Sequence, residues 1–302
     1  MRALVLVPAF LALALPRVAQ AGDPSFSYGK YEEKKTVEWK ATASAGLLLS
    51  TGNSNQLSFS AAVMGSRHDG KNKLQLDVSG AYARATIVSA NDVNMNGLID
   101  DASEVRRDSA TSTALWNAKL RYDRFFSENN VGYITAFAWG NTPAGKKVVA
   151  GGQIGYSRQL YKNEMHLLVA ELGYDFSYER YTTGNNLDYY LHSLRAYLGY
   201  NLSLSKDTSF LVDVEYLGNM NPYDGPYSAR VGAFEDSRIN GRVALTTRIW
   251  KKLSFRIAFT AKFDNVPAPA ATIGGLKFGP NYLPPSEKLD TITDASLVVS
   301  FL

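Results

Sequence analysis

The chain has no cysteine among its 302 residues and only three histidines, His68, His166 and His192. Without cysteine the fold cannot rest on disulfide bonds, and a lipid anchor attached to a cysteine is excluded. The histidines do not combine with a serine and an acidic residue in the arrangement that hydrolytic enzymes require. We therefore predict that the protein is not an enzyme.

The chain also lacks a strong net charge and any long apolar run. Its formal charge is +4, and it falls to +2 (4 − 2) once Arg2 and Arg17 are left out. Such a value does not indicate a nucleic-acid partner. The longest apolar stretch, Ala3 to Leu15, is shorter than the roughly 18 residues that a membrane-spanning helix needs.

This stretch belongs to a pattern that is typical of a secretory leader. Arg2 supplies the positive start, and Ala19-Gln20-Ala21 forms a cleavage site of the small-x-small type. We predict a signal peptide over residues 1–21 and export through the general secretory route. An uncleaved membrane anchor is the alternative.

From residue 36 to the end, apolar and polar residues alternate in segments of about ten to fifteen residues. In Leu253 to Asp264, for example, Phe255, Ile257 and Phe259 alternate with polar neighbours. A period of two indicates strands with one apolar and one wet face. We count about twelve such strands, which are longer than the strands of a usual soluble β-sandwich, the alternative fold.

Tight turns alternate with mostly longer connections along the chain. The turns are His68 to Asn72, Ser127 to Asn130, Lys162 to Glu164, Ser205 to Asp207, and Trp250 to Lys252. The other connections are Thr51 to Asn55, Ser89 to Asp108, Asn141 to Lys147, Thr182 to Asp188, Gly218 to Ser237, and Val266 to Asp290. This alternation predicts a closed, antiparallel transmembrane β-barrel with short periplasmic turns and longer extracellular loops.

The barrel prediction has consequences for location and partners. Because lipid offers no partner to free backbone groups, the first and last strands must pair. We expect a barrel over residues 36–302 in a bacterial outer membrane, after a short periplasmic segment over residues 22–35. Its partners would be outer-membrane lipid and the barrel-assembly machinery, which recognises terminal strands like Thr291 to Leu302; the oligomeric state stays open.

Two stretches resemble a known family. Ala45 to Phe59 (AGLLLSTGNSNQLSF) and Glu171 to Tyr181 (ELGYDFSYERY) are similar to the salt-induced outer-membrane proteins, domain of unknown function 481 (DUF481). The resemblance covers most of the chain after the leader. It implies a β-barrel of unassigned activity, and it supplies no catalytic residues.

The polar side of each strand faces the inside of such a barrel. Basic residues concentrate on the tenth and eleventh predicted strands and acidic residues on the seventh and ninth, which permits a charge-separated wall of the kind that sets selectivity in pores. The residues that we predict to line the lumen are Lys119, Arg121, Glu171, Asp175, Arg195, Asp213, Glu215, Arg238, Arg242, Arg256 and Lys262.

The strand number leaves more than one function open. Twelve strands lie between small barrels filled by side chains and porins of roughly 16 to 18 strands, which hold an aqueous channel. A narrow solute or ion channel of unassigned substrate is our first hypothesis. The alternative is a structural barrel whose facing charges neutralise one another and close the lumen. An embedded enzyme is the third.

One connection has the ligand spacing of a calcium site. The run Asp92 to Asp100 follows the pattern D-x-N-x-N-G-x-x-D of an EF-hand loop, with a glycine at the sharp turn. Glu104 stands one residue after the position of the usual bidentate glutamate. Calcium is the one cofactor that the sequence indicates, and an ordinary solvated loop is the alternative. The candidate ligands are Asp92, Asn94, Asn96, the Leu98 carbonyl, Asp100 and Glu104.

If this loop binds calcium, the dissociation constant should lie at roughly 10⁻⁴ to 10⁻³ M, as in extracellular modules. The double variant Asp92→Ala, Asn96→Ala should lose calcium-induced protection of the loop from proteases and keep a heat-modifiable barrel on gels. Calorimetry that detects no binding to the unaltered protein at millimolar calcium would leave the loop a polar connection only.

Overall fold

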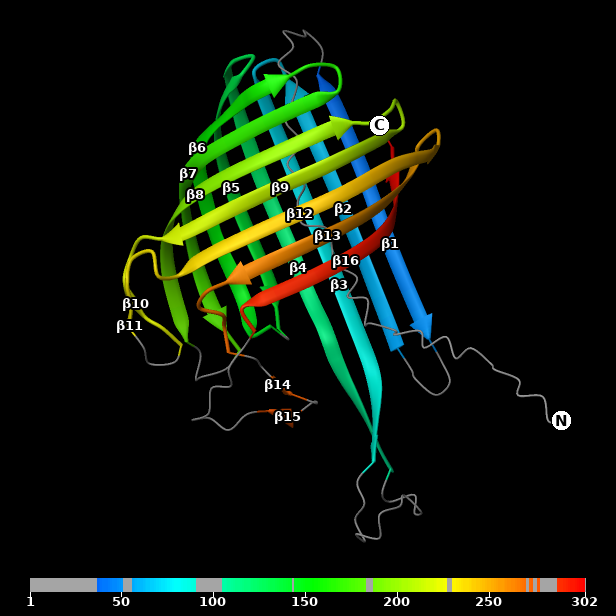
Figure 1. Cartoon of the computed structure of the whole chain (residues 1–302), viewed down its shortest axis with the longest axis vertical. Helices are drawn as coiled ribbons and strands as arrows, with labels where there is room; N and C mark the ends of the chain where they lie inside the picture. Colours follow the sequence, from blue (N-terminus) through cyan, green and yellow to red (C-terminus); the bar gives the residue numbers. More distant parts are fainter. Residues whose placement is uncertain are drawn as a thin grey trace, which may run out of the picture.

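The computed structural model describes residues 37–50, 56–90, 105–142, 144–182, 187–226, 230–269, 272–273, 276–277 and 287–301. Twelve of its strands form one closed antiparallel barrel, and two small hairpins lie outside it (Figure 1). The predicted fold class is thus confirmed. In the described part of the chain, no helix is long and apolar enough to cross a membrane.

The barrel strands have the following bounds. They are β1 (Glu38–Ser50), β2 (Gln56–Asp69), β3 (Asn72–Ala90), β4 (Val105–Ser127), β5 (Asn130–Asn141), β6 (Lys146–Lys162), β7 (His166–Tyr181), β8 (Asp188–Ser203), β9 (Thr208–Asn219), β12 (Ser237–Trp250), β13 (Leu253–Asp264) and β16 (Leu289–Ser300). The hairpins pair β10 (Tyr223–Asp224) with β11 (Arg230–Val231) and β14 (Thr272–Ile273) with β15 (Leu276–Lys277).

The first and last barrel strands pair, as the sequence predicts. β1 lies antiparallel to β16, with Thr42 opposite Ser300 and Ala45 opposite Leu297. The Phe301 amide extends this edge by donating to the Ala41 carbonyl at 3.0 Å. All other neighbours in the barrel are antiparallel as well, so no described strand of the barrel is left with a free edge.

The two faces of the wall have opposite chemistry, inverted relative to a soluble protein. Apolar side chains point outward, and Val63 and Leu172 are each 57% exposed. Polar side chains point inward, and Ser58 and Glu179 are fully buried. Such a wall fits an apolar surrounding outside and a polar lumen inside.

At one end of the barrel, which we call the turn end, the strands are joined by the short connections 70–71, 128–129, 163–165, 204–207 and 251–252. Local chemistry stabilises these turns. Gly70 adopts a positive φ of 55°, which glycine tolerates without strain. The Asn163 side chain accepts hydrogen bonds from the Met165 and His166 amides, and Ser205 does the same for Asp207 and Thr208.

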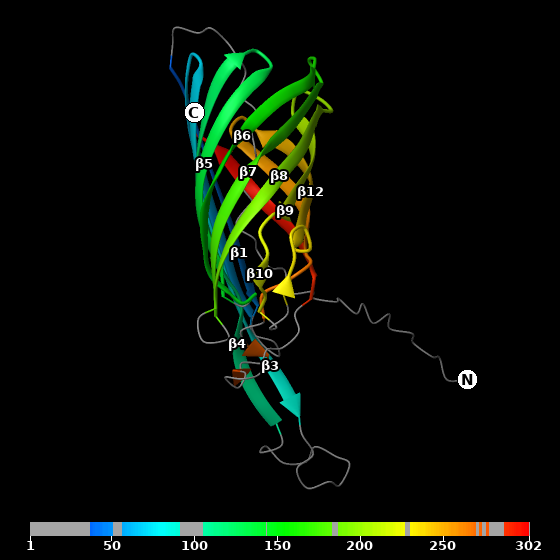
Figure 2. The ribbon, with the colours of Figure 1, turned by 90° about the vertical axis from the view of Figure 1, so that its left-hand side faces the viewer.

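The opposite end, which we call the loop end, carries the longer connections (Figures 1 and 2). Here β3 and β4 extend beyond the other strands. Because β3 ends at Ala90 and β4 begins at Val105, the connection between them is shorter than the predicted Ser89 to Asp108. Two predicted loops contain the hairpins β10–β11 and β14–β15. The predicted leader (1–21), tail (22–35), TGNSN turn and calcium loop lie outside the described residues.

The orientation in the membrane stays a prediction that single cysteines can test, because the chain has none of its own. Asp224 at the loop end and Glu164 at the turn end are both exposed. We expect a membrane-impermeant maleimide to label Asp224→Cys on intact cells and Glu164→Cys only after lysis. Labelling of Glu164→Cys alone on intact cells would reverse the orientation.

Candidate functional site

The structure places the eleven predicted lumen residues on inward-facing positions of β4, β7, β8, β9, β12 and β13. The alternation of burial along these strands shows this: each of the buried residues Arg121, Glu171, Asp175, Arg195 and Arg242 has an exposed apolar residue next to it in the chain. Seven of the eleven line one cavity in the lumen. The candidate site is therefore the interior of the barrel.

A central ion-pair network, formed by Arg121, Asp123, Glu171, Arg195 and Glu215, crosses the lumen between strands that are not neighbours. Arg121 on β4 binds Glu171 on β7 at 2.8 Å, although β5 and β6 lie between these strands. Glu171 also accepts from Arg195 on β8 at 2.7 Å. Arg121 reaches Asp123 at 2.8 Å, and Arg195 reaches Glu215 on β9 at 2.6 Å. The two guanidinium groups therefore connect β4, β7, β8 and β9 through side chains inside the barrel.

A tyrosine and two glycines make this crossing possible. The ring of Tyr133 on β5 faces the Arg121 guanidinium, with 4.2 Å between the ring centroid and Cζ of Arg121. The Tyr133 hydroxyl accepts a hydrogen bond from Arg195 at 3.0 Å. Gly155 and Gly173 are directly opposite each other on β6 and β7. A Cβ atom on either would stand 2.6 Å from the Tyr133 hydroxyl. The glycine pair therefore leaves the space that the tyrosine occupies.

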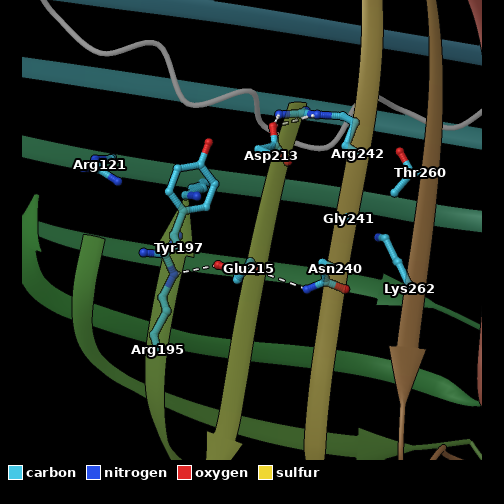
Figure 3. A pocket seen from close by; sticks show the side chains of 11 residues that line it. Arg121, Arg195, Tyr197, Asp213, Glu215, Asn240, Gly241, Arg242, Thr260 and Lys262 are labelled. Atoms are coloured by element: carbon cyan, nitrogen blue, oxygen red, sulfur yellow. Dashed lines mark hydrogen bonds and ion pairs between the residues drawn. The ribbon is translucent and has the colours of Figure 1, made fainter. Parts of the chain in front are cut away.

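Beside this network lies a cavity of about 120 Å³. Figure 3 shows it between β8, β9, β12 and β13, with the Arg195–Glu215 and Arg242–Asp213 pairs on its wall. The lining contains five cationic side chains and two carboxylates, and Tyr197, Asn240 and Thr260 add neutral polar groups. The charged members are Lys119, Arg121, Arg195, Asp213, Glu215, Arg242 and Lys262.

The charges in the lumen are interleaved rather than separated into two walls. Arg242 on β12 pairs with Asp213 directly opposite it on β9. Asp175 on β7 accepts from Gln153 on β6 at 2.8 Å. Arg256 lies on the inward face of β13, opposite Thr246. On the same strand, Lys262 lies opposite Asp290 of β16, so both basic strands have acidic residues opposite some of their cations.

A second cluster of charges, the loop-end cluster, consists of Lys146, Glu179, Asp236, Arg238 and Asp264. Lys146 on β6 contacts Glu179 on β7 and Asp264 on β13, each at 3.2 Å. Four strands lie between β6 and β13, so this contact spans the barrel. Arg238 on β12 pairs with Glu179, with Asp236 at 3.2 Å and with Asp264 at 3.6 Å.

An apolar layer covers the loop-end cluster. Tyr181, Tyr189, Leu191 and Ala268 are buried together, and Tyr223 of the β10–β11 hairpin packs on Tyr189 with ring centres 5.2 Å apart. The Tyr223 hydroxyl donates to Asp236 at 3.0 Å. Burial raises the pKa of the Asp236 carboxyl above its usual value, and Arg238 opposes that rise. The hairpin is therefore tied to the charged cluster.

A glycine fixes another connection at the same end. Gly145 adopts a positive φ of 79°, and a Cβ there would stand 2.0 Å from the Pro269 carbonyl oxygen. The segment after β13 therefore packs directly on the turn between β5 and β6. Together with the packing of Ala268 against Tyr181, Tyr189 and Leu191, this contact holds the segment after β13 against the loop end of the barrel.

Among the described residues, no group of three or more histidine, cysteine or acidic side chains has the arrangement of a metal site. The tentative calcium ligands lie outside the described ranges, so calcium binding stays a prediction. His166 and His192 instead face outward and contact Tyr200 and Tyr174.

Several residues of the site were missed from the sequence. The predicted lumen residues are all charged, and so they do not include the uncharged Tyr133, Tyr197, Asn240 and Thr260. Lys146 was missed because it was assigned to a connection. The alternation of faces along a strand could have found the four neutral residues. Each stands an even number of positions from a predicted lumen residue or a buried polar residue of its own strand, and therefore shares its inward face.

Comparisons with solved structures show similar barrels at low identity. The NanC porin is 7% identical, with a TM-score of 0.45 over 87% of this chain and 100% of that chain. The translocator domain of the autotransporter NalP from Neisseria meningitidis is 11% identical, with a TM-score of 0.40 over 88% of this chain and 87% of that chain. OmpT of Vibrio cholerae is 7% identical, with a TM-score of 0.36 over 88% of this chain and 97% of that chain. No protein with a curated description matches.

A family profile matches most of the chain. The matching residues are 43–301, which include all or most of every barrel strand. The family has no assigned function, so the match extends to architecture and not to activity. The chain belongs to the family described as protein of unknown function DUF481.

Proposed function

We propose that the protein is a narrow outer-membrane channel that prefers anions. The observation that supports this proposal is the cavity in the lumen, whose lining carries five cations against two carboxylates. Rings and clusters of arginine and lysine favour anions in pores because they stabilise a negative charge that has left bulk water. Export through the secretory route, with the loop end at the cell surface, would place this lumen between periplasm and exterior.

The channel would be narrow because side chains occupy much of its cross-section. The central network reaches from β4 to β9, and the loop-end cluster reaches from β6 to β13. Solutes would pass only between these bridges or after they rearrange. This arrangement fits small ions better than bulky solutes, and it does not require a dedicated catalytic group.

A closed structural barrel is the second candidate. The contact of Lys146 with Asp264 across the lumen favours it, as does the buried Tyr181, which donates to Glu179 in the same cluster. In that case the ion pairs would only neutralise the interior, and the lumen would carry no flow. The two candidates differ in one measurable property, which is conductance.

We expect the purified, refolded protein to conduct in planar bilayers, with a reversal potential under a KCl gradient that indicates chloride preference. The double variant Lys119→Gln, Lys262→Gln should shift this potential toward potassium, because two positive charges leave the cavity lining. Absence of conductance in the unaltered protein supports the closed barrel instead. A potential that the double variant does not change would contradict the role of the cavity.

The loop-end cluster should limit the current. Glu179 accepts from Lys146, Arg238 and Tyr181, so Glu179→Gln leaves buried cations with too few carboxylates. We expect higher conductance and a free energy of unfolding, measured by urea titration in vesicles, lower by about 3 to 5 kcal/mol.

The matched control is Asp188→Asn, which breaks an exposed, outward-facing pair with Arg180 near the same end of β7 and β8. It should leave conductance and unfolding nearly unchanged. If Glu179→Gln behaves like this control, the cluster neither closes nor stabilises the lumen.

A further inference from the structure

We propose that the cavity in the lumen is a binding site for a small oxyanion, with Lys119 as its principal ligand. The inference deepens the proposed channel function by naming its substrate class. It rests on the contents of the cavity: five cations, two carboxylates and the hydrogen-bonding groups of Tyr197, Asn240 and Thr260.

Most cations of the lining already have partners. Arg121 and Arg195 hold Glu171 between them, and Arg195 also holds Glu215. Arg242 is paired with Asp213. These pairs build the wall and set its shape, and they leave little of the guanidinium charge for a ligand.

Lys119 differs from them. Within the described residues, its ammonium group makes no hydrogen bond or ion pair with another side chain, whereas the other four cations of the lining each have an interaction. Asn117, the next inward residue on β4, leaves its amide nitrogen without a partner as well. A half-buried ammonium group among protein atoms is stabilised when an anion supplies the missing hydrogen bonds.

Charge and size indicate the ligand. Counting Asp123 and Glu171, which the two arginines bind, the region has five cations and four carboxylates, a surplus of one positive charge (5 − 4). The cavity, of about 120 Å³, is large enough to hold a small oxyanion together with water. A tetrahedral oxyanion such as phosphate or sulfate is small enough for this cavity and carries the negative charge that the surplus cation lacks.

Calorimetric titration of the full, detergent-solubilised barrel with inorganic phosphate tests the site, and sulfate serves as a second probe. We expect saturable binding with one site per chain. Lys119→Gln should weaken it by about tenfold or more, the factor that follows from loss of one charge-assisted hydrogen bond. Lys119→Arg should retain most of the affinity, because it keeps the charge.

The matched control is Lys73→Gln, which removes a buried lumen cation that does not line the cavity. It should leave phosphate affinity nearly unchanged, and heat-modifiable migration on gels checks that every variant is folded. No saturable binding to the unaltered protein, or equal weakening by Lys119→Gln and Lys73→Gln, would overturn the inference.

The binding site and the channel can be refuted independently of each other. Phosphate binding in a protein that conducts nothing would refute the channel and keep the site. Conductance in a protein that binds no phosphate would refute the site and keep the channel.

Discussion

The structure depends on one constraint, which is that backbone amides and carbonyls have no hydrogen-bonding partner in hydrocarbon. A sheet that crosses such a layer must close on itself, and here β1 closes on β16. Closure gives every strand one face toward lipid and one toward the lumen. The period of two in the sequence, the outward leucines and valines and the buried inward charges all follow from this.

Closure also explains the ion pairs. Once polar side chains point into a barrel of only twelve strands, they are taken away from bulk water and must find partners inside. Arg121, Glu171 and Arg195 solve this by bridging across the lumen, with Tyr133 seated over the Gly155–Gly173 pair. A buried pair is stable only while both members remain, so these residues constrain one another's replacement. The lumen is thus shaped by charge neutralisation before any transport is considered.

The sequence predicts the barrel well because the wall is governed by a local rule. Alternation in Leu253 to Asp264 marks an inward and an outward face without knowledge of any partner strand. It cannot predict which inward charges meet, because that depends on the register and curvature of the whole barrel. Lys146 and Asp264 are far apart in the chain and have four strands between them in the wall, yet they touch. For the same reason, the composition of single strands allowed a charge-separated wall, whereas the register of the strands places basic residues beside acidic ones.

The central claim is that the lumen, although crossed by ion pairs, is a passage for small anions. Osmotic swelling of liposomes that contain the purified barrel measures this directly, with salts of one cation and anions of increasing size. We expect fast swelling with chloride and phosphate and slow swelling with large organic anions, because the bridges leave only narrow gaps. Equal rates with and without the protein for every salt would contradict the claim.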